Sequence, residues 1–234
     1  MIRRQLTAAV PFALSLMVLS AWRPARAQGL AGISDADASL GLKSALESGA
    51  VAAIGLLGRP DGFMGNPNVR IPLPGFLQDA AKLLKALGQR KRIEELELAM
   101  NRAAEAAVPM ARDLLVNAAK SISVTDAKNI LAGGETSVTR FFADKTRVPL
   151  AERFHPVVSQ ATEKVGLADK YNAVASKAVG VGLVKSEDAS IQHYVTRKAL
   201  DGLYLMIGEE EKKIRQNPLA SGSAILGKVF GALR

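Results

Sequence analysis

One stretch decides the fold: QRKRIEELELAMNRAAEAAVPMARDLLVNAAK, residues 89–120. Its apolar residues recur at spacings of three and four, which places them on one face of a long helix. That line consists of Ile93, Leu96, Met100, Ala103, Ala107, Met110, Leu114 and Ala118. Pro109 is expected to kink or break the helix, because proline removes one backbone hydrogen bond and clashes with the preceding turn. The stretch predicts a long helix that packs against others.

The rest of the chain is also predicted to be helical. Ala and Leu are abundant, aromatic residues make up only 5% of the chain, and no stretch alternates apolar and polar residues. Further helices are expected at about residues 34–58, 74–88, 123–133, 136–145, 149–165, 168–179, 186–216 and 219–231. Residues 59–73 hold three prolines and two glycines, so they are predicted to form an ordered loop. The sequence therefore predicts an all-α, single-domain bundle of about eight to ten helices.

The first 27 residues predict export. Met1–Arg4 is a basic start, an apolar run extends over residues 6–21, and Ala25–Ala27 has the small-x-small pattern of a cleavage site. This order is typical of a signal peptide, and the apolar run is short for a membrane span. We expect cleavage after Ala27, which leaves residues 28–234 as one helical domain in the periplasm or outside the cell.

The composition of the mature chain excludes several classes of partner. Loss of residues 1–27 removes four arginines and no acid, so the formal net charge falls from +9 to +5. This mild charge predicts no nucleic-acid partner. The chain has no cysteine, so a lipid anchor and a thiolate metal site are excluded, and no membrane segment is expected after cleavage. General secretion is favoured over the twin-arginine route, because Ile2 precedes Arg3 and Arg4 where Ser or Thr is usual.

The two histidines, His155 and His193, are interpreted as surface or core-edge residues. They lack the i,i+4 spacing of a helical metal pair, and there is no cysteine beside them. No nucleophile elbow, phosphate-binding loop or dinucleotide fingerprint occurs in the chain. We therefore expect no metal, no cofactor and no catalytic residue, and an enzymatic role is disfavoured.

Two polar segments form the candidate ligand-binding site. On the long helix, three polar residues lie within about one turn among alanines that let another helix approach closely. The loop at 59–73 adds polar and aromatic residues between glycines that permit positive φ. The candidate binding residues are Asn101, Arg102, Glu105, Asp61, Phe63 and Asn66. The alternatives are a buried polar clamp between helices and an ordered connector without a ligand.

These features predict a non-catalytic module that binds an unidentified periplasmic protein or small ligand. One alternative is a hydrolase in which Glu105 and Asp201 act as acid and base, which requires both carboxyl groups in one cleft. A second alternative is a membrane-surface or nucleic-acid binder that uses the basic residues 89–92. A solvated helix start explains those residues better, because no aromatic residues interleave with them.

Six segments, in order, carry a resemblance to a known family. They are residues 61–67 (DGFMGNP), 71–74 (IPLP), 100–106 (MNRAAEA), 126–134 (DAKNILAGG), 194–203 (YVTRKALDGL) and 210–218 (EEKKIRQNP). From about Gly41 to Phe230 the chain resembles the domain-of-unknown-function 4197 family of exported bacterial proteins. Residues 136–142 (TSVTRFF) depart from that pattern, where an aromatic pair beginning with Tyr is expected. The resemblance implies an exported, single-domain, mostly helical protein, and it supplies no activity, cofactor or catalytic residue.

Overall fold

In the computed structural model of the protein, the stretch 89–120 forms a helix that Pro109 interrupts, as predicted. Helix α3 (Arg90–Ala107) is followed by a 3-10 turn, η2 (Val108–Ala111), and by α4 (Arg112–Lys120). Pro109 lies at the start of η2. An N–H group at this position has no acceptor within the helix, so its absence in proline costs no helical hydrogen bond.

Beyond this turn, each buried position lies one residue later in the chain than predicted. Met110 is 42% exposed, and Leu114 and Ala118 are half-buried. The buried positions of this segment are Ala111, Leu115 and Ala119. The tighter turn at Pro109 changes the rotation of the chain between α3 and α4, so a single α-helical period does not extend across it.

The structure describes residues 34–134, 137–164, 167–180, 182, 188 and 190–217. Within these ranges it contains eight α-helices and no strand, which confirms the all-α class. The predicted signal segment, residues 1–27, and the predicted helix at 219–231 lie outside the described residues.

Helix α1 (Asp35–Leu57) is a core helix of the bundle and packs against α8, α4 and α5. Its buried face includes Leu42, Leu46, Ala50, Ala53 and Leu57. Within the described part of the chain, its segment Ser39–Leu57 is the one helix long and apolar enough to cross a membrane by length and composition. Half of the apolar window is buried inside the protein, as expected for a core helix.

Local sequence signals explain how one short helix ends and how another begins. Helix α2 (Gly75–Leu84) passes into a turn, η1 (Lys85–Gln89), where Gly88 has a φ of +80° that favours glycine. Helix α5 (Val124–Ala132) begins with a capping box. There, Ser123 Oγ accepts the backbone N–H of Asp126 at 3.0 Å, and the Asp126 carboxylate accepts the backbone N–H of Ser123 at 3.1 Å.

Helix α6 (Ser137–Glu163) is continuous, so the prediction of two helices at 136–145 and 149–165 was wrong. Both Pro149 and Pro156 lie inside it. An internal proline costs about 3 kcal/mol or more, whereas a fully buried large apolar side chain contributes about 1.5–3 kcal/mol. The buried face carries a residue at almost every fourth position: Val138, Phe142, Thr146, Leu150, Phe154, Val158 and Thr162. Burial along this whole face offsets the two prolines.

Helices α7 (Leu167–Gly180) and α8 (Ile191–Gln216) complete the part of the chain that the structure describes. The predicted start of the last long helix at Ser186–Asp188 was wrong, because Ser190 caps α8. Ser190 Oγ accepts the backbone N–H of His193 at 3.2 Å. The carboxylate of Asp188 instead binds the guanidinium of Arg197.

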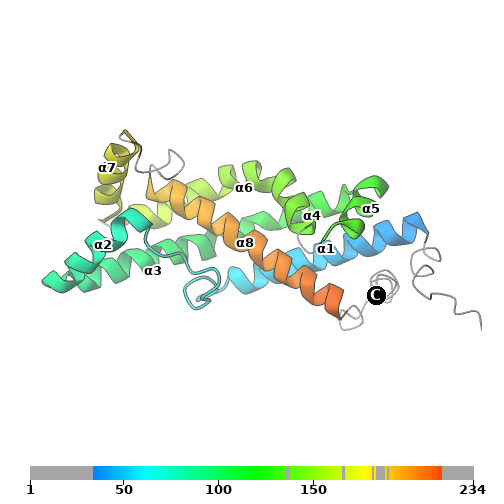
Figure 1. Cartoon of the computed structure of the whole chain (residues 1–234), viewed down its shortest axis with the longest axis horizontal. Coiled ribbons are helices and arrows are strands. Elements are labelled where there is room, and N and C mark those ends of the chain that lie inside the picture. The colour runs from blue at the N-terminus through cyan, green and yellow to red at the C-terminus, as the bar shows by residue number, and fades with distance from the viewer. Residues whose placement is uncertain are drawn as a thin grey trace, which may run out of the picture.

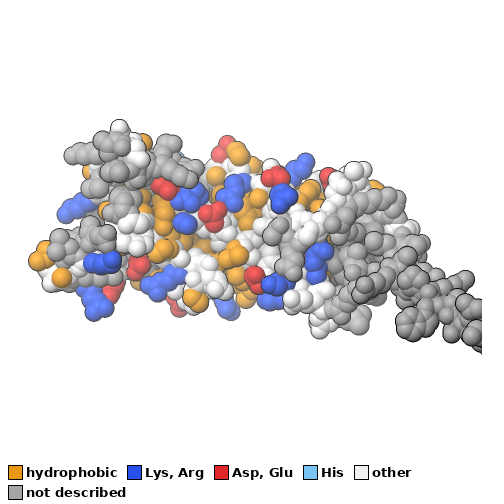
Figure 2. Space-filling model, viewed as in Figure 1, with side chains coloured by type: hydrophobic (Ala, Val, Ile, Leu, Met, Phe, Trp, Pro, Cys, Tyr) orange, Lys and Arg blue, Asp and Glu red, His pale blue; other side chains and the backbone are white. Residues whose placement is uncertain are grey.

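The helices form an elongated bundle that α8 crosses diagonally (Figure 1). Helix α6 packs against α8 and α3, and the buried residues of the helices form one continuous core. Helices α2 and α7 lie at one end of the bundle, and α5 lies at the other with the start of α1 (Figure 1). On the face seen in Figure 2, basic and acidic side chains are interspersed among apolar ones.

Candidate functional site

The six candidate residues predicted from the sequence lie together, and they hold the loop 58–73 in place. Glu105 is buried on α3. Its Oε1 accepts the backbone N–H groups of Phe63 at 3.0 Å and Met64 at 3.1 Å. Its Oε2 accepts a hydrogen bond of 2.6 Å from Arg102. Both carboxylate oxygens therefore have partners within the protein.

Arg102 links the helix to the start of the loop. Its second terminal nitrogen donates to Asp61 Oδ1 at 2.8 Å. Asp61 has a φ of +64°, a left-handed conformation that is unusual for a residue other than glycine. The hydrogen bond to Glu105 raises the pKa of Arg102. The ion pairs of Arg102 thus stabilise a strained turn of the loop.

Asn101 forms a second clamp, further along the loop. Its Oδ1 accepts the N–H of Ile71 at 2.9 Å, and its Nδ2 donates to the carbonyl of Ile71 at 2.9 Å. The same Nδ2 donates to the carbonyl of Glu97 at 2.8 Å. Asn101 is fully buried, so these bonds satisfy an amide that is removed from water.

The remaining two candidates face α8. Phe63 is fully buried and lies against Gly202. Asn66 Oδ1 accepts the N–H of Asn68 at 3.1 Å, and its Nδ2 lies 3.8 Å from the sulfur of Met206. The cluster thus behaves as the buried polar clamp and ordered connector that the sequence left open. Its buried polar atoms bind the loop, whereas the side chains of Arg102 and Asp61 are 41% and 64% exposed.

The hydrolase alternative requires Glu105 and Asp201 to share a cleft. Asp201 instead accepts one hydrogen bond of 2.9 Å from Arg147 and lies 3.5 Å from Arg197. The two carboxylates have different partners in different ion networks.

A groove between α6 and α8 is a further candidate site. We call it the α6–α8 groove, and its volume is about 480 Å³. Its lining residues are Arg147, Ala151, Glu152, His155, His193, Thr196, Arg197 and Leu200. The pairs Arg147–Asp201 and His155–His193 show that the two helices run antiparallel. Eight residues of helix separate the two ends of the groove, which corresponds to about 12 Å.

A chain of alternating charges begins at the Arg147 end of the groove and runs along α8. Arg147 contacts Asp201, Asp201 contacts Arg197, and Arg197 makes a bidentate pair with Asp188, with Nε–Oδ1 at 3.0 Å and Nη2–Oδ2 at 2.8 Å. The guanidinium of Arg147 also lies 5.0 Å from the ring centre of Tyr204. This stacking and pairing hold the arginines in defined positions.

The other end of the groove carries the two histidines. The rings of His155 and His193 are 4.8 Å apart between centroids and tilted by 50°. Ser190 Oγ lies 2.7 Å from Nδ1 of His193. Burial lowers the pKa of His155, and the charge of His193 lowers it further. His155 therefore favours its neutral form.

Thr196, which also lines the groove, carries a polar group without a hydrogen-bond partner. Its Oγ1 is buried and has no hydrogen-bond partner in the described part of the chain. A buried hydroxyl without a partner costs about 1–3 kcal/mol. By contrast, Thr146 Oγ1 on α6 bonds the carbonyl of Phe142 at 2.6 Å and the hydroxyl of Tyr204 at 2.8 Å.

The sequence interpretation missed this groove. His155 and His193 stand 38 positions apart, and no linear spacing marks them as neighbours. The repeat of Arg147, Ala151 and His155 at every fourth residue places them on one helix face, but it does not show which helix faces them. Only the antiparallel packing of α6 on α8 brings the two sets together.

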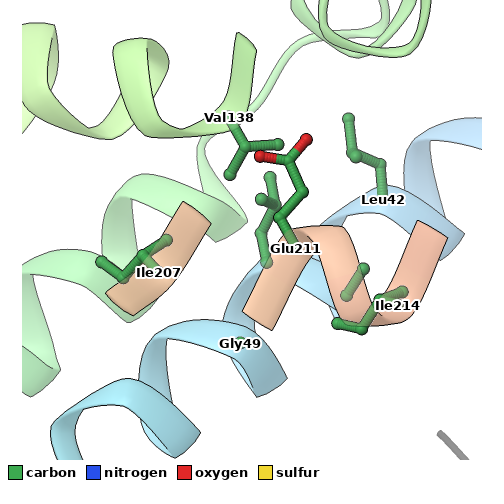
Figure 3. Close-up of a pocket in the computed structure, with 8 residues that line it drawn as sticks. Leu42, Gly49, Val138, Ile207, Glu211 and Ile214 are labelled. Carbon is green, nitrogen blue, oxygen red and sulfur yellow. The ribbon is translucent and has the colours of Figure 1, made fainter. Parts of the chain in front are cut away.

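A second cavity lies between α1, α6 and α8 (Figure 3). Its volume of about 10 Å³ holds at most about one water molecule. Glu211 reaches from α8 toward Val138 among apolar neighbours (Figure 3). Its carboxylate accepts a hydrogen bond of 2.8 Å from Arg215, which also donates to the carbonyl of Ile130. This buried ion pair ties α8 to α5 and leaves no room for a ligand.

Comparison with known proteins places the chain in one family. No curated protein and no solved structure matches it. A protein-family model described as "Protein of unknown function (DUF4197)" matches residues 32–231, which is most of the chain. This match confirms the resemblance carried by the six sequence segments. The chain therefore belongs to the DUF4197 family.

Proposed function

We propose that the protein is an exported, non-catalytic binding module and that the α6–α8 groove is its ligand site. The observation that carries the proposal is the groove itself. Its volume of about 480 Å³ falls in the usual range of small-molecule sites, about 300–1,000 Å³. Arg147 and the two histidines provide polar groups at opposite ends, and Ala151 and Leu200 provide an apolar wall. A small molecule with an apolar body and polar ends fits this lining.

The arrangement of the hydroxyl groups supports binding rather than catalysis. Ser190 is the hydroxyl that contacts a histidine of the groove, but its Oγ is also the cap of α8. It contacts Nδ1 of His193, whereas in a serine-histidine-aspartate triad the serine contacts Nε2 and a carboxylate orients Nδ1. The hydroxyl of Thr196 is buried. Neither group is arranged as an activated nucleophile.

The export part of the proposal rests on the signal pattern at residues 1–27. It predicts that the mature chain begins at Gln28. Cell fractionation followed by N-terminal sequencing tests this directly. A full-length chain that stays in the cytoplasm would refute export and leave the groove proposal intact.

Ligand binding is tested by thermal shift of the mature protein against a panel of small molecules. A compound that binds the folded state raises the melting temperature according to its concentration and affinity. The variant Ala151→Trp fills the groove and should abolish the shift. The matched control is Gln160→Trp, which places the same side chain on an exposed position of α6 and should retain the shift. Equal shifts in both variants would place the ligand outside the groove.

A further inference from the structure

We propose that His155 and His193 form a binding site for one divalent transition-metal ion, with Zn²⁺ as the simplest probe. The inference rests on the proposed function of the α6–α8 groove and names a ligand class for its histidine end. His155 and His193 are in contact, and the sequence assigned no role to either side chain.

The separation of the two rings matches shared coordination. The ring centroids of His155 and His193 are 4.8 Å apart. Two imidazoles on one tetrahedral zinc ion place their centroids about 5 Å apart, because each Zn–N bond is about 2.0–2.1 Å long. The rings come from two helices that pack against each other. The fold therefore holds them at this distance without any movement of the backbone.

Ser190 provides the kind of partner that orients a metal-binding histidine. Such histidines use one ring nitrogen for the metal and bond the other to a neighbouring group. Ser190 Oγ lies 2.7 Å from Nδ1 of His193 and also accepts the backbone N–H of His193. A hydroxyl oxygen has two lone pairs, so it can accept both N–H groups. In that tautomer, Nε2 of His193 carries a free lone pair for a metal.

The charges around the pair are compatible with a cation. Glu152 lines the same groove and contributes a negative charge. Arg147, at the other end of the groove, and Arg197, one turn along α8 from His193, are both paired with aspartates. The two arginines therefore present less net positive charge to an ion at the histidine end.

Water must complete the coordination shell. In the described ranges, no group of three or more His, Cys, Asp and Glu residues is placed to hold a metal ion. The groove is open to solvent, so water can fill the remaining positions. A site with two protein ligands exchanges its metal readily and leaves positions for a further ligand. This chemistry suits a binding module better than a permanent structural metal.

The composition of the chain makes the source of any imidazole ligation unambiguous. The chain contains two histidines and no cysteine, so imidazole ligation in an untagged protein must come from this pair. The mature chain is treated with EDTA, dialysed and titrated with Zn²⁺ by calorimetry. A parallel sample with Cu²⁺ is examined by electron paramagnetic resonance. We expect one ion per chain and a spectrum with nitrogen couplings from two imidazoles.

Variants distinguish one ion that both histidines bind from ions that each histidine binds alone. His155→Gln and His193→Gln should each weaken Zn²⁺ affinity by about 100-fold or more, because the second ligand acts intramolecularly. The double variant His155→Gln/Gln160→His keeps two histidines but moves one to an exposed position of α6, and it should not restore affinity. Circular dichroism confirms that each variant is folded. On the wild-type protein, Zn²⁺ should also protect the histidines from diethyl pyrocarbonate.

Three results would overturn the inference: two ions per chain, a copper spectrum with one imidazole, or unchanged affinity in either single variant. The compound screen of the proposed function is run in EDTA, so the two ideas fail separately. Compounds that bind the groove in a protein that ignores Zn²⁺ would reject the metal site and leave the groove proposal standing.

Discussion

Gly202 on α8 lies directly against the ring of Phe63. A Cβ atom at Gly202 would be 2.8 Å from Phe63 Cε1 and 3.2 Å from Cβ of Val69. Phe63 is fully buried, so its ring has no free space to move into. The absence of a side chain at position 202 therefore allows the loop 58–73 to pack on α8.

We predict that Gly202→Ala destabilises the protein by about 1–3 kcal/mol, the usual cost of overpacking a core. Helix propensity alone would favour alanine by about 1 kcal/mol. The control is Gly55→Ala on α1, where a Cβ would meet nothing within 4 Å, and it should be neutral or stabilising. Urea unfolding measures both variants. A stabilising effect in both variants would show that the Phe63 ring can move to make room for a Cβ atom at position 202.

We predict that Glu105→Leu lowers the free energy of unfolding by about 3 kcal/mol or more. It removes the acceptor for the N–H groups of Phe63 and Met64, and each unsatisfied buried donor costs about 1–3 kcal/mol. Glu105→Gln keeps an oxygen acceptor but loses the charge that pairs with Arg102, so its loss should be smaller. Thermal and urea unfolding give the order. Equal losses in the two variants would argue against the loop clamp.

We predict opposite effects for the same substitution at two buried threonines. Thr196→Val should raise stability by about 1 kcal/mol, because it removes a buried hydroxyl that has no partner in the described ranges. Thr146→Val should lower stability by about 1–2 kcal/mol, because it breaks the bond to Tyr204. Melting temperatures under identical conditions decide the matter. A loss of stability in Thr196→Val would reveal a partner for its hydroxyl.

We predict that stability falls as the pH is lowered from 7.5 to 5. Burial lowers the pKa of His155 in the folded protein, whereas an unfolded histidine titrates near pH 6.5. The unfolded chain therefore binds more protons in this range, and the stability present above about pH 6.5 is lost as the pH falls. His155→Gln should flatten this dependence. Unfolding curves at several pH values test it, and an unchanged slope in the variant would contradict the assignment.

Local chemistry in the sequence predicted many elements correctly. The all-α class follows from the apolar spacing, and the interruption at Pro109 follows from the missing N–H of proline. The capping box at Ser123 and the turn at Gly88 depend on side chains within a few residues. Such features do not depend on contacts between distant residues, so they can be predicted from the sequence.

Long-range packing determined the structure in the regions where local sequence rules gave a wrong or incomplete prediction. The sequence predicted a break between residues 145 and 149, just before Pro149, yet α6 continues because the core buries one face along its whole length. Sequence reasoning grouped Asp61, Phe63 and Glu105 correctly. It did not show that the Glu105 carboxylate binds the backbone of the loop, because that contact joins residues about 40 positions apart.

The sequence by itself therefore determined the helical class, the loop at 59–73, the turn and cap signals, and the family. Only the tertiary structure decided what the polar residues face. It brought His155 next to His193 and placed Asp201 between two arginines. The physical reason is that helix periodicity sets which residues share a face, whereas the partner of that face depends on the packing of the whole core.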